Sequence, residues 1–177
     1  MPWRMTSAPT LRPCTPADAD SLGLVGAATF LETFAGVLDG QAIVAHCAQA
    51  HDPDRYIQLL GMGCHIWIAE VQPDRCPIGY VVVGPCLLPI ARPGEIDIKR
   101  IYVLSRWHGS GVGEALMQKA VDHARADHQE RLIVGVYVGN SRAQAFYQRW
   151  GFEKISQRTF SVGPKQYEDY VYALPLG

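Results

Sequence analysis

The sequence predicts a single α/β domain built on a mixed sheet, and three observations carry that prediction. The chain has 177 residues, 48% of them hydrophobic, which suits one domain over residues 1–177 with one sizeable core. Its periodic segments follow the order strand, helices, three strands, helix, strand, helix, two strands. Neither a repeat nor a low-complexity tract interrupts them. Strands separated by helices tend to pair in parallel, so the sheet is expected to be mixed.

The first third of the chain is predicted to be one short strand followed by helices. Residues 10–12 form the strand, and Pro13 ends it. From there to about Leu60 the pattern is helical in two or three pieces. The pieces are separated near residues that disfavour helices, which are Gly36, Gly40 and Pro53.

A hairpin is predicted in the middle of the chain. Residues 64–71 alternate in part, and residues 78–84 are rich in β-branched side chains, as strands are. The segment between them holds Pro73, Asp74 and Pro77, which are typical of a turn. We therefore expect the two strands to lie side by side and antiparallel.

The strand predicted at residues 95–104 has an unusual order of apolar residues. Ile96 and Ile98 share one parity, whereas Ile101 and Val103 share the other. One apolar face keeps one parity along a regular strand, so the slip indicates a β-bulge between the two pairs. A central strand buried on both faces would give the same letters, and the pattern alone does not decide.

The last third of the chain alternates helices and strands. The clearest amphipathic helix covers residues 109–126, with apolar residues on one face and polar residues on the other. A strand at residues 131–138 and a short helix at residues 141–149 follow. Two more strands are expected at residues 152–161 and 167–174.

The charge balance and the cysteines exclude several classes of protein. Sixteen Lys and Arg against seventeen Asp and Glu give a formal net charge of −1, so neither a nucleic-acid nor a membrane partner is expected. Five scattered cysteines without a CxxC pair, and no apolar targeting segment, favour a reduced, cytoplasmic setting. No metal site is expected, because the spacing of His46, Cys47 and His51 matches no usual ligand pattern.

A glycine-rich turn precedes the long helix. Gly109, Gly111 and Gly113 lack a Cβ, so their N–H groups can approach a ligand closely. They lie at a helix N-terminus, where unpaired N–H donors and the helix dipole bind phosphate. No Lys follows them, which excludes a P-loop, and their spacing differs from the dinucleotide fingerprint GxGxxG.

Three segments around this turn form an ordered set of motifs. Residues 101–103 read IYV, and residues 106–111 read RWHGSG, which fits the pattern R-x-x-G-x-G. Residues 140–152 fit the pattern N-x-x-A-x-x-F-Y-x-x-x-G-F. In this order the segments resemble the strand core, the acetyl-CoA-binding signature and the following helix of the GNAT superfamily of N-acetyltransferases. With the order of elements, the resemblance covers about residues 10–174.

The resemblance implies both a fold and an activity. The implied fold is α+β: a mixed, mostly antiparallel central sheet of about seven strands with a bulged, splayed fourth strand, flanked by about four helices. The implied activity is direct transfer of acetyl from acetyl-CoA to an amine, with a small-molecule amine favoured over a protein. Residues 30–34 and 160–163, before Asp169, resemble bacterial spermine/spermidine-type polyamine N-acetyltransferases. A homodimer is a further implication.

The resemblance also implies which residues bind the cofactor. The glycine turn would hold the pyrophosphate, the bulged strand would pair with the pantetheine arm, and the following helix would supply further contacts. The implied cofactor-binding residues are Ile101, Tyr102, Val103, Arg106, His108, Gly109, Ser110, Gly111, Val112, Gly113, Asn140, Ala143, Phe146 and Tyr147.

Two catalytic roles are implied as well. Tyr147 would be the general acid, because a phenol within hydrogen-bond reach can protonate the departing thiolate. Glu95 would be the general base that takes a proton from the ammonium group, with Asp97 or a chain of waters as alternatives. A core aromatic and a surface charge are the plain structural explanations of Tyr147 and Glu95.

The acceptor pocket is the least determined part of the prediction. Phe30, Glu32, Phe34 and Asp97 are the candidate substrate-binding residues. Glu32 and Asp39 could hold a cationic acceptor, although exposed helix carboxylates are the plain structural explanation. The identity of the amine stays open. Two other functions are weighed: a catalytically inactive CoA-binding regulatory module, and a dinucleotide-dependent oxidoreductase, which the glycine spacing disfavours.

Overall fold

The computed structural model describes residues 8–177, which form one seven-stranded sheet and five α-helices. The strand order is β1-β2-β3-β4-β5-β7-β6, with only β4 and β5 parallel. The strands are β1 (Thr10–Pro13), β2 (His65–Val71), β3 (Cys76–Pro85), β4 (Glu95–Val103), β5 (Arg131–Tyr137), β6 (Glu153–Val162) and β7 (Lys165–Pro175). The helices are α1 (Ala19–Phe34), α2 (Gly40–Ala50), α3 (Pro53–Gly61), α4 (Val112–Ala126) and α5 (Ser141–Arg149), with short 3₁₀ helices at Pro16–Asp18 and Ser105–Trp107.

The predicted α+β class and mostly antiparallel mixed sheet are confirmed. The hairpin expected at residues 64–84 is the antiparallel pair β2–β3. The structure has five α-helices where about four were expected, because the helical stretch before β2 divides into three. It divides near the glycines and the proline that the sequence marks as breaks.

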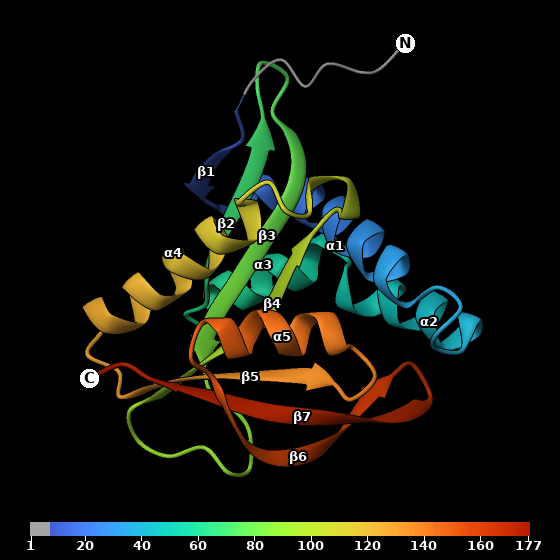
Figure 1. Cartoon of the computed structure of the whole chain (residues 1–177). Helices are drawn as coiled ribbons and strands as arrows, with labels where there is room; N and C mark the ends of the chain where they lie inside the picture. The colour runs from blue at the N-terminus through green and yellow to red at the C-terminus, as the bar shows by residue number, and fades with distance from the viewer. Residues whose placement is uncertain (1–7) are drawn as a thin grey trace.

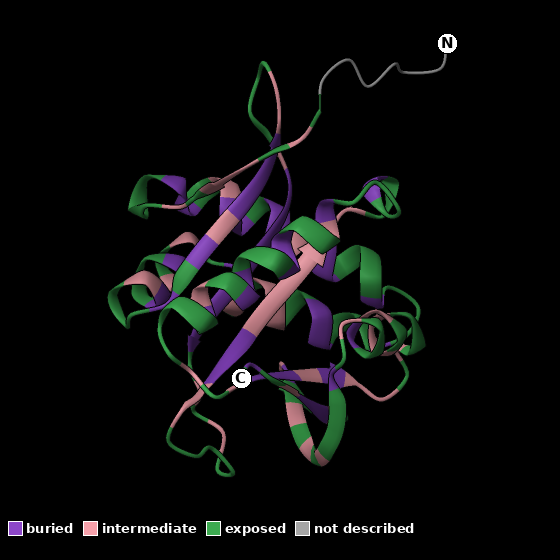
Figure 2. Cartoon of the chain, turned by 60° about the vertical axis from the view of Figure 1, so that its left-hand side comes forward, coloured by how far each residue is buried: buried purple, intermediate pink, exposed green. Residues whose placement is uncertain are grey.

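Helices cover both faces of the sheet (Figure 1). α4 and α5 pack on the face to which Val81 and Val83 of β3 point. α1 and α3 pack on the opposite face, to which Tyr80 and Val82 point. The central strands are buried along much of their length, whereas the helices expose their outer sides (Figure 2). The sheet therefore separates two hydrophobic cores.

The β-bulge predicted in the fourth strand is present in β4. Val82 pairs with Arg100 and Val83 pairs with Ile98, so Lys99 is the extra residue. The bulge places all four apolar residues of the strand against the α4–α5 core, namely Ile96, Ile98, Ile101 and Val103. The parity slip in the sequence is thus explained by the bulge, which also points Arg100 to the opposite face.

β4 and β5 separate beyond the bulge. They pair in parallel only from Glu95–Arg131 to Ile98–Val134. Within residues 8–177, no ladder joins the second half of β4 to β5. The predicted splayed strand therefore leaves an opening between two adjacent strands in the middle of the sheet.

The helix expected at residues 109–126 begins only at Val112. Gly109 and Gly111 have φ angles of 78° and 88°, a left-handed conformation that an α-helix does not contain. The preceding turn is therefore irregular. It ends where the first N–H groups of α4 begin.

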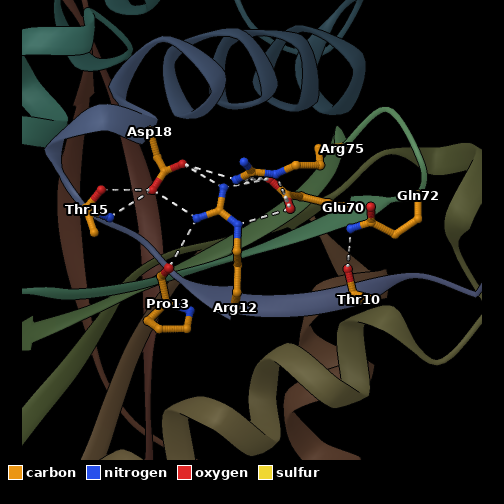
Figure 3. A network of polar contacts seen from close by, with 8 residues as sticks. All are labelled: Thr10, Arg12, Pro13, Thr15, Asp18, Glu70, Gln72 and Arg75. Atoms are coloured by element: carbon orange, nitrogen blue, oxygen red, sulfur yellow. Dashed lines mark hydrogen bonds and ion pairs between the residues drawn. The ribbon is translucent and has the colours of Figure 1, made fainter.

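An ion network joins β1 to β2 (Figure 3). Arg12 donates to both carboxylate oxygens of Asp18, at 3.0 and 2.6 Å, and to both of Glu70, at 3.1 and 2.7 Å. Arg75 lies 3.4 Å from Glu70, and Asp18 also accepts from the Thr15 N–H at 2.8 Å. Each charge in this network has a partner of opposite sign.

Three findings bear on the classes weighed from the sequence. No helix within residues 8–177 is long and apolar enough to cross a membrane. The same residues contain no group of three or more His, Cys, Asp or Glu placed to hold a metal ion. Residues 1–7, which belong to the predicted domain 1–177 and to the N-terminal segment considered for targeting, lie outside the described residues.

Candidate active site

A cavity of about 790 Å³ lies where β4 and β5 separate. Its walls come from the second half of β4, from β5, from the glycine turn and from α5. The end of α1 contributes Thr33 and Phe34. Because α1 and α5 lie on opposite faces of the sheet, the cavity passes through the opening from one face to the other.

The glycine turn is open toward this cavity. Gly109 and Gly111 line it, and a Cβ at either position would meet nothing within 4 Å. In the described part of the chain, no acceptor binds the N–H groups of Gly111, Val112 or Gly113. A diphosphate fits this turn, because free donors and the dipole of the 15-residue helix α4 converge there.

The other residues implied for the cofactor differ in what they can offer. Val112 is buried in the core and offers only its backbone, while Arg106 and Ser110 do not line the cavity. The Asn140 side chain lines the cavity and also caps α5, accepting from the Ala143 N–H at 3.1 Å. The remaining implied residues that line the cavity are Ile101, Tyr102, Val103, His108, Gly113, Ala143, Phe146 and Tyr147.

Two arginines of α5 were missed by sequence reasoning. Arg142 and Arg149 line the cavity beside the glycine turn, and Arg142 contacts His108 Nδ1. Arg149 lies 3.9 Å from Glu114, a loose and exposed ion pair. These cations suit the phosphates of a bound nucleotide. The available signal was their position on the helix that follows Asn140.

Tyr147 of α5 lines the cavity. Its ring is 5% exposed and packs against Phe146, Phe152 and Tyr172. Its hydroxyl has no hydrogen bond to any residue from 8 to 177 and is not sealed from the cavity. Burial raises the pKa of the Tyr147 phenol well above its ordinary value, and Tyr102 and Asp169 raise it further. The phenol therefore keeps its proton at neutral pH.

The structure does not bring Glu95 to the cavity. Its side chain is buried at the start of β4, where Arg131 Nε donates to Oε1 at 2.8 Å and the Arg92 N–H donates to Oε2 at 2.8 Å. Burial raises the pKa of Glu95, but the hydrogen bonds from Arg131 and Arg92 outweigh it, and the pKa is lowered. With both oxygens engaged, this carboxylate acts in the structure as an ion-pair partner.

Asp97 is also outside the cavity. It is 8% exposed, and Lys99 Nζ lies 3.0 Å from its Oδ1. Burial raises the pKa of Asp97, and Lys99 opposes that rise. Asp97 precedes the bulge, so its side chain does not reach the second half of β4 that lines the cavity.

The residues of α1 that were predicted to bind the acceptor amine differ in whether they reach the cavity. Glu32 and Phe34 line the cavity, whereas Phe30 is buried behind them, stacked on His46 at 4.4 Å between ring centroids. Glu32 accepts from the Ser105 Oγ at 2.5 Å and from the Ser105 N–H at 2.8 Å. These hydrogen bonds lower the pKa of Glu32 and tie α1 to the loop after β4.

Asp169 is an acidic residue of the cavity that sequence reasoning did not assign to the site, as is Glu114 beside Arg149. It lies on β7 opposite Tyr137 and is 4% exposed. Arg158 donates to its Oδ2 at 3.3 Å, while its Oδ1 has no hydrogen bond in the described structure and is not sealed off. Burial raises the pKa of Asp169, although Arg158 opposes that rise. Asp169 reaches the cavity because β7 pairs with β5, which lies far from it in the sequence. No local sequence motif assigns it a role in the site.

Comparisons with known proteins agree with this geometry. Residues 29–152 match the model of the acetyltransferase (GNAT) family. An uncharacterized N-acetyltransferase of Mycobacterium bovis is 34% identical over 95 residues, which are 54% of this chain and 61% of that relative. A probable N-acetyltransferase of Mycobacterium tuberculosis is 29% identical over 157 residues, 87% of this chain and 84% of that relative. The chain therefore belongs to the acetyltransferase (GNAT) family.

The fold of this chain is also similar to that of solved N-acetyltransferase structures. The crystal structure of the PaiA N-acetyltransferase from Thermoplasma acidophilum in complex with coenzyme A superposes with a TM-score of 0.76. The two share 14% identity, and the superposition covers 96% of this chain and 99% of that one. At this identity the likeness establishes the fold. The chain spans about 61% of the length of the Mycobacterium bovis relative.

Proposed function

We propose that this protein is an acetyl-CoA-dependent N-acetyltransferase with a small-molecule amine as acceptor, and that residues 1–177 are one catalytic domain. One observation carries the proposal: a single cavity joins free diphosphate donors on one face of the sheet to a carboxylate, Asp169, on the other. Its volume of about 790 Å³ lies in the range of small-molecule sites. The family and the coenzyme A complex of the Thermoplasma protein support the same cofactor.

The α4–α5 face is the cofactor side of the proposed site. The N–H groups of Gly111, Val112 and Gly113 would hold the diphosphate, with Arg142 and Arg149 as neighbouring cations. The edge of β4 that leaves β5 offers main-chain groups for the pantetheine amides. Bound acetyl-CoA would supply the acetyl group as a thioester.

Tyr147 is proposed as the general acid. As the acceptor nitrogen forms its bond to the acetyl carbon and the carbon–sulfur bond breaks, the phenol gives its proton to the departing sulfur. Its raised pKa and its free hydroxyl suit that role, because the proton is present and no protein acceptor holds it within residues 8–177.

Asp169 is proposed as the general base, in place of Glu95. A base must be ionised, within reach of the ammonium group, and not fully hydrogen-bonded. Asp169 has one oxygen without a hydrogen bond to any described residue, and its charge acts on both Tyr147 and Tyr102. Glu95 has neither a free oxygen nor a place on the cavity wall. The proton therefore passes from the acceptor nitrogen to Asp169.

Ligand-dependent unfolding tests the proposal directly. Acetyl-CoA at a hundredfold excess over its Kd should raise the free energy of unfolding by about 2.7 kcal/mol, measured by thermal or urea unfolding. NAD serves as the control nucleotide and should give no change. A folded protein that acetyl-CoA and CoA both leave unchanged would contradict the proposal.

Turnover separates an enzyme from an inactive CoA-binding module. Thiol release from acetyl-CoA across a panel of amines should be stimulated by at least one amine. Tyr147→Phe should then lower kcat by roughly 100-fold or more with an unchanged Kd for acetyl-CoA, because it removes only the hydroxyl that carries the proton and keeps the ring. Full activity of Tyr147→Phe would remove Tyr147 as the acid, and CoA binding without any stimulated turnover would favour the module.

A further inference from the structure

We propose that the acceptor amine also carries a carboxylate, and that Arg100 binds this carboxylate on the α1–α3 side of the cavity. The inference rests on the acetyltransferase function proposed above and names its substrate class: amino acids and similar zwitterions. It starts from Arg100, a guanidinium on the cavity wall that no acidic side chain of residues 8–177 neutralises.

The guanidinium of Arg100 has hydrogen-bonding capacity that the described residues leave unmet. Its Nη1 is buried and has no hydrogen-bond acceptor within the described structure. The Nε and Nη2 of Arg100 are not sealed off within the described structure, and Arg100 lines the cavity, so a ligand there can reach them. Arg100 is half-buried, and a cation shielded from water without an acidic partner is costly, so such a residue is usually paired or binds a ligand.

The position of Arg100 is fixed by groups that do not neutralise it. Its guanidinium carbon lies 5.0 Å from the ring centroid of Tyr56, a stacked cation–π contact. Tyr56 is fully buried, and its hydroxyl hydrogen bonds with His51 Nδ1 at 2.8 Å. Gly26 makes room for this pair, since a Cβ there would lie 2.2 Å from the Tyr56 hydroxyl. The cation is thus held ready before a ligand arrives.

The imidazoles and phenols around Arg100 carry no charge at neutral pH. Burial and the charge of Arg100 lower the pKa of His46 to about 4, and burial and the charges of Arg100 and His46 lower that of His51 to about 3. Burial raises the pKa of each neighbouring tyrosine, so these stay protonated; they are Tyr56, Tyr80 and Tyr102. The positive charge of Arg100 is therefore not balanced by these neighbours.

The two ends of a zwitterion match the charges on this side of the cavity. Asp169 offers a free carboxylate oxygen for the ammonium group, and Arg100 offers N–H donors for the carboxylate. Of the other acids on the wall, Glu32 is already hydrogen-bonded to Ser105, and Glu114 lies beside Arg149 and accepts from the Trp150 Nε1–H. A polyamine would place a second cation in a cavity that already holds an unpaired Arg100, so the charges disfavour it.

An apolar part of the cavity wall fits the rest of such a substrate. The rings of Phe34, Tyr137 and Phe160 line the same side of the cavity. Phe34 and Tyr137 meet edge to face, with ring centroids 6.1 Å apart. An amino acid with an apolar or aromatic side chain would bury that side chain against these rings.

Matched acceptors test the carboxylate. The pairs are phenylalanine with 2-phenylethylamine and tyrosine with tyramine, which differ only by the carboxylate, and spermidine is added. The variants are Arg100→Gln and the control Arg125→Gln, since Arg125 lies exposed on α4 away from the cavity. Initial rates of amine-stimulated thiol release give kcat/KM for each acceptor.

The expected result is a preference that depends on Arg100. Wild type should acetylate the carboxylated member of a pair at least 10-fold better by kcat/KM. Arg100→Gln should lose roughly 10- to 100-fold on that member and little on its partner, while Arg125→Gln behaves as wild type. Equal rates within the pairs, faster spermidine acetylation, or equal losses on both members would overturn the inference.

A binding measurement covers acceptors outside the panel. N-acetylphenylalanine and N-acetylalanine, compared with their amides, are product-like probes for CoA-saturated protein. The carboxylates should raise the Tm, the amides should not, and Arg100→Gln should abolish the shift that Arg125→Gln keeps. No shift with any carboxylate would overturn the inference, whereas the absence of an acetyl-CoA shift, or CoA binding without amine-stimulated turnover, would overturn the proposed function.

Discussion

Two arginines of this protein show opposite ways of placing a guanidinium in a fold. Arg12 is bound by four carboxylate oxygens from Asp18 and Glu70 at the β1 edge of the sheet (Figure 3). Arg100 lies on β4 in the middle of the sheet, and within residues 8–177 no carboxylate pairs with it. Both guanidinium groups are partly shielded from water, so only the partners differ.

The two arginines illustrate two roles of charged side chains: some stabilise the fold, and others stay available to bind a ligand. The chain supplies acids where an arginine joins two elements, as Glu70 of β2 does for Arg12. In the cavity, Arg100 is left without an acid and Asp169 is left with a free oxygen, which lowers stability but leaves both groups available. Substitutions in the two regions should therefore act on different quantities.

The largest effect is expected at Asp169. Asp169→Asn should lower kcat/KM roughly 100- to 10,000-fold, because the amide cannot take the proton of the acceptor. The free energy of unfolding should fall by no more than about 1 kcal/mol, because Arg158, the ion-pair partner of Asp169, is partly exposed to water. Steady-state rates and urea unfolding measure the two quantities.

Glu168→Gln is the matched control for Asp169→Asn. Glu168 is the next residue of β7, is exposed, and contacts Gln157 and Thr159 away from the cavity. It should keep wild-type rates. If Asp169→Asn also kept them, Asp169 would not be the base, and a solvent-borne base would be the simplest replacement.

The paired arginine should dominate stability. Arg12→Gln leaves the nearly buried carboxylates of Asp18 and Glu70 without their main partner and should lower the free energy of unfolding by about 2–3 kcal/mol. Arg100→Gln removes an unpaired charge and should leave stability unchanged or slightly higher. Urea unfolding at pH 7 compares the two.

This comparison has a clear contrary outcome. If Arg100→Gln were destabilised as much as Arg12→Gln, Arg100 would be a structural residue. Its position on the cavity wall would then be no evidence that it binds a ligand. The rate per folded molecule should be unaffected by Arg12→Gln, because Arg12 does not line the cavity.

Acid should weaken the Arg12 network in a defined pH range. Hydrogen bonds from Arg12 lower the pKa of Asp18 to about 2, from about 4 in an unfolded chain. The stabilisation is therefore complete above pH 4 and is lost as the pH falls toward 2. The loss should be about 1–2 kcal/mol, allowing for the water around Arg12. Asp18→Asn should lack this part of the pH dependence. If the free energy of unfolding fell equally with pH in wild type and in Asp18→Asn, the pH dependence would not come from Asp18.

The sequence predicted the parts of the fold that depend on local pattern. The parity slip between Ile98 and Ile101 predicted the bulge, and the glycine spacing at 109–113 predicted the turn. The helix after this turn differs from the prediction in one respect. It begins at Val112 and not at residue 109, because two glycines in the left-handed conformation keep the preceding residues out of the helix. Local sequence sets where an element begins and how it bends.

The acceptor side of the site was less accessible from sequence. Glu95 was chosen as base from its place before the glycine turn, but nothing local shows that Arg131, 36 residues away, would bind it. Asp169 enters the cavity only because β7 inserts between β5 and β6. Charges on distant strands become a site through topology, and a single sequence carries no local mark of such a meeting.

The smallest effect expected from the comparison concerns the histidines next to Arg100. Burial is the main reason that the pKa of His46 is lowered to about 4 and that of His51 to about 3, and the charge of Arg100 adds to it. Arg100→Gln should therefore raise both pKa values but leave them below the ordinary 6.5, because the burial remains. NMR titration of the imidazole resonances measures the change, with Arg125→Gln as control. Unchanged pKa values would mean that the charge of Arg100 is already balanced, and the contrast with Arg12 would then fail at its starting point.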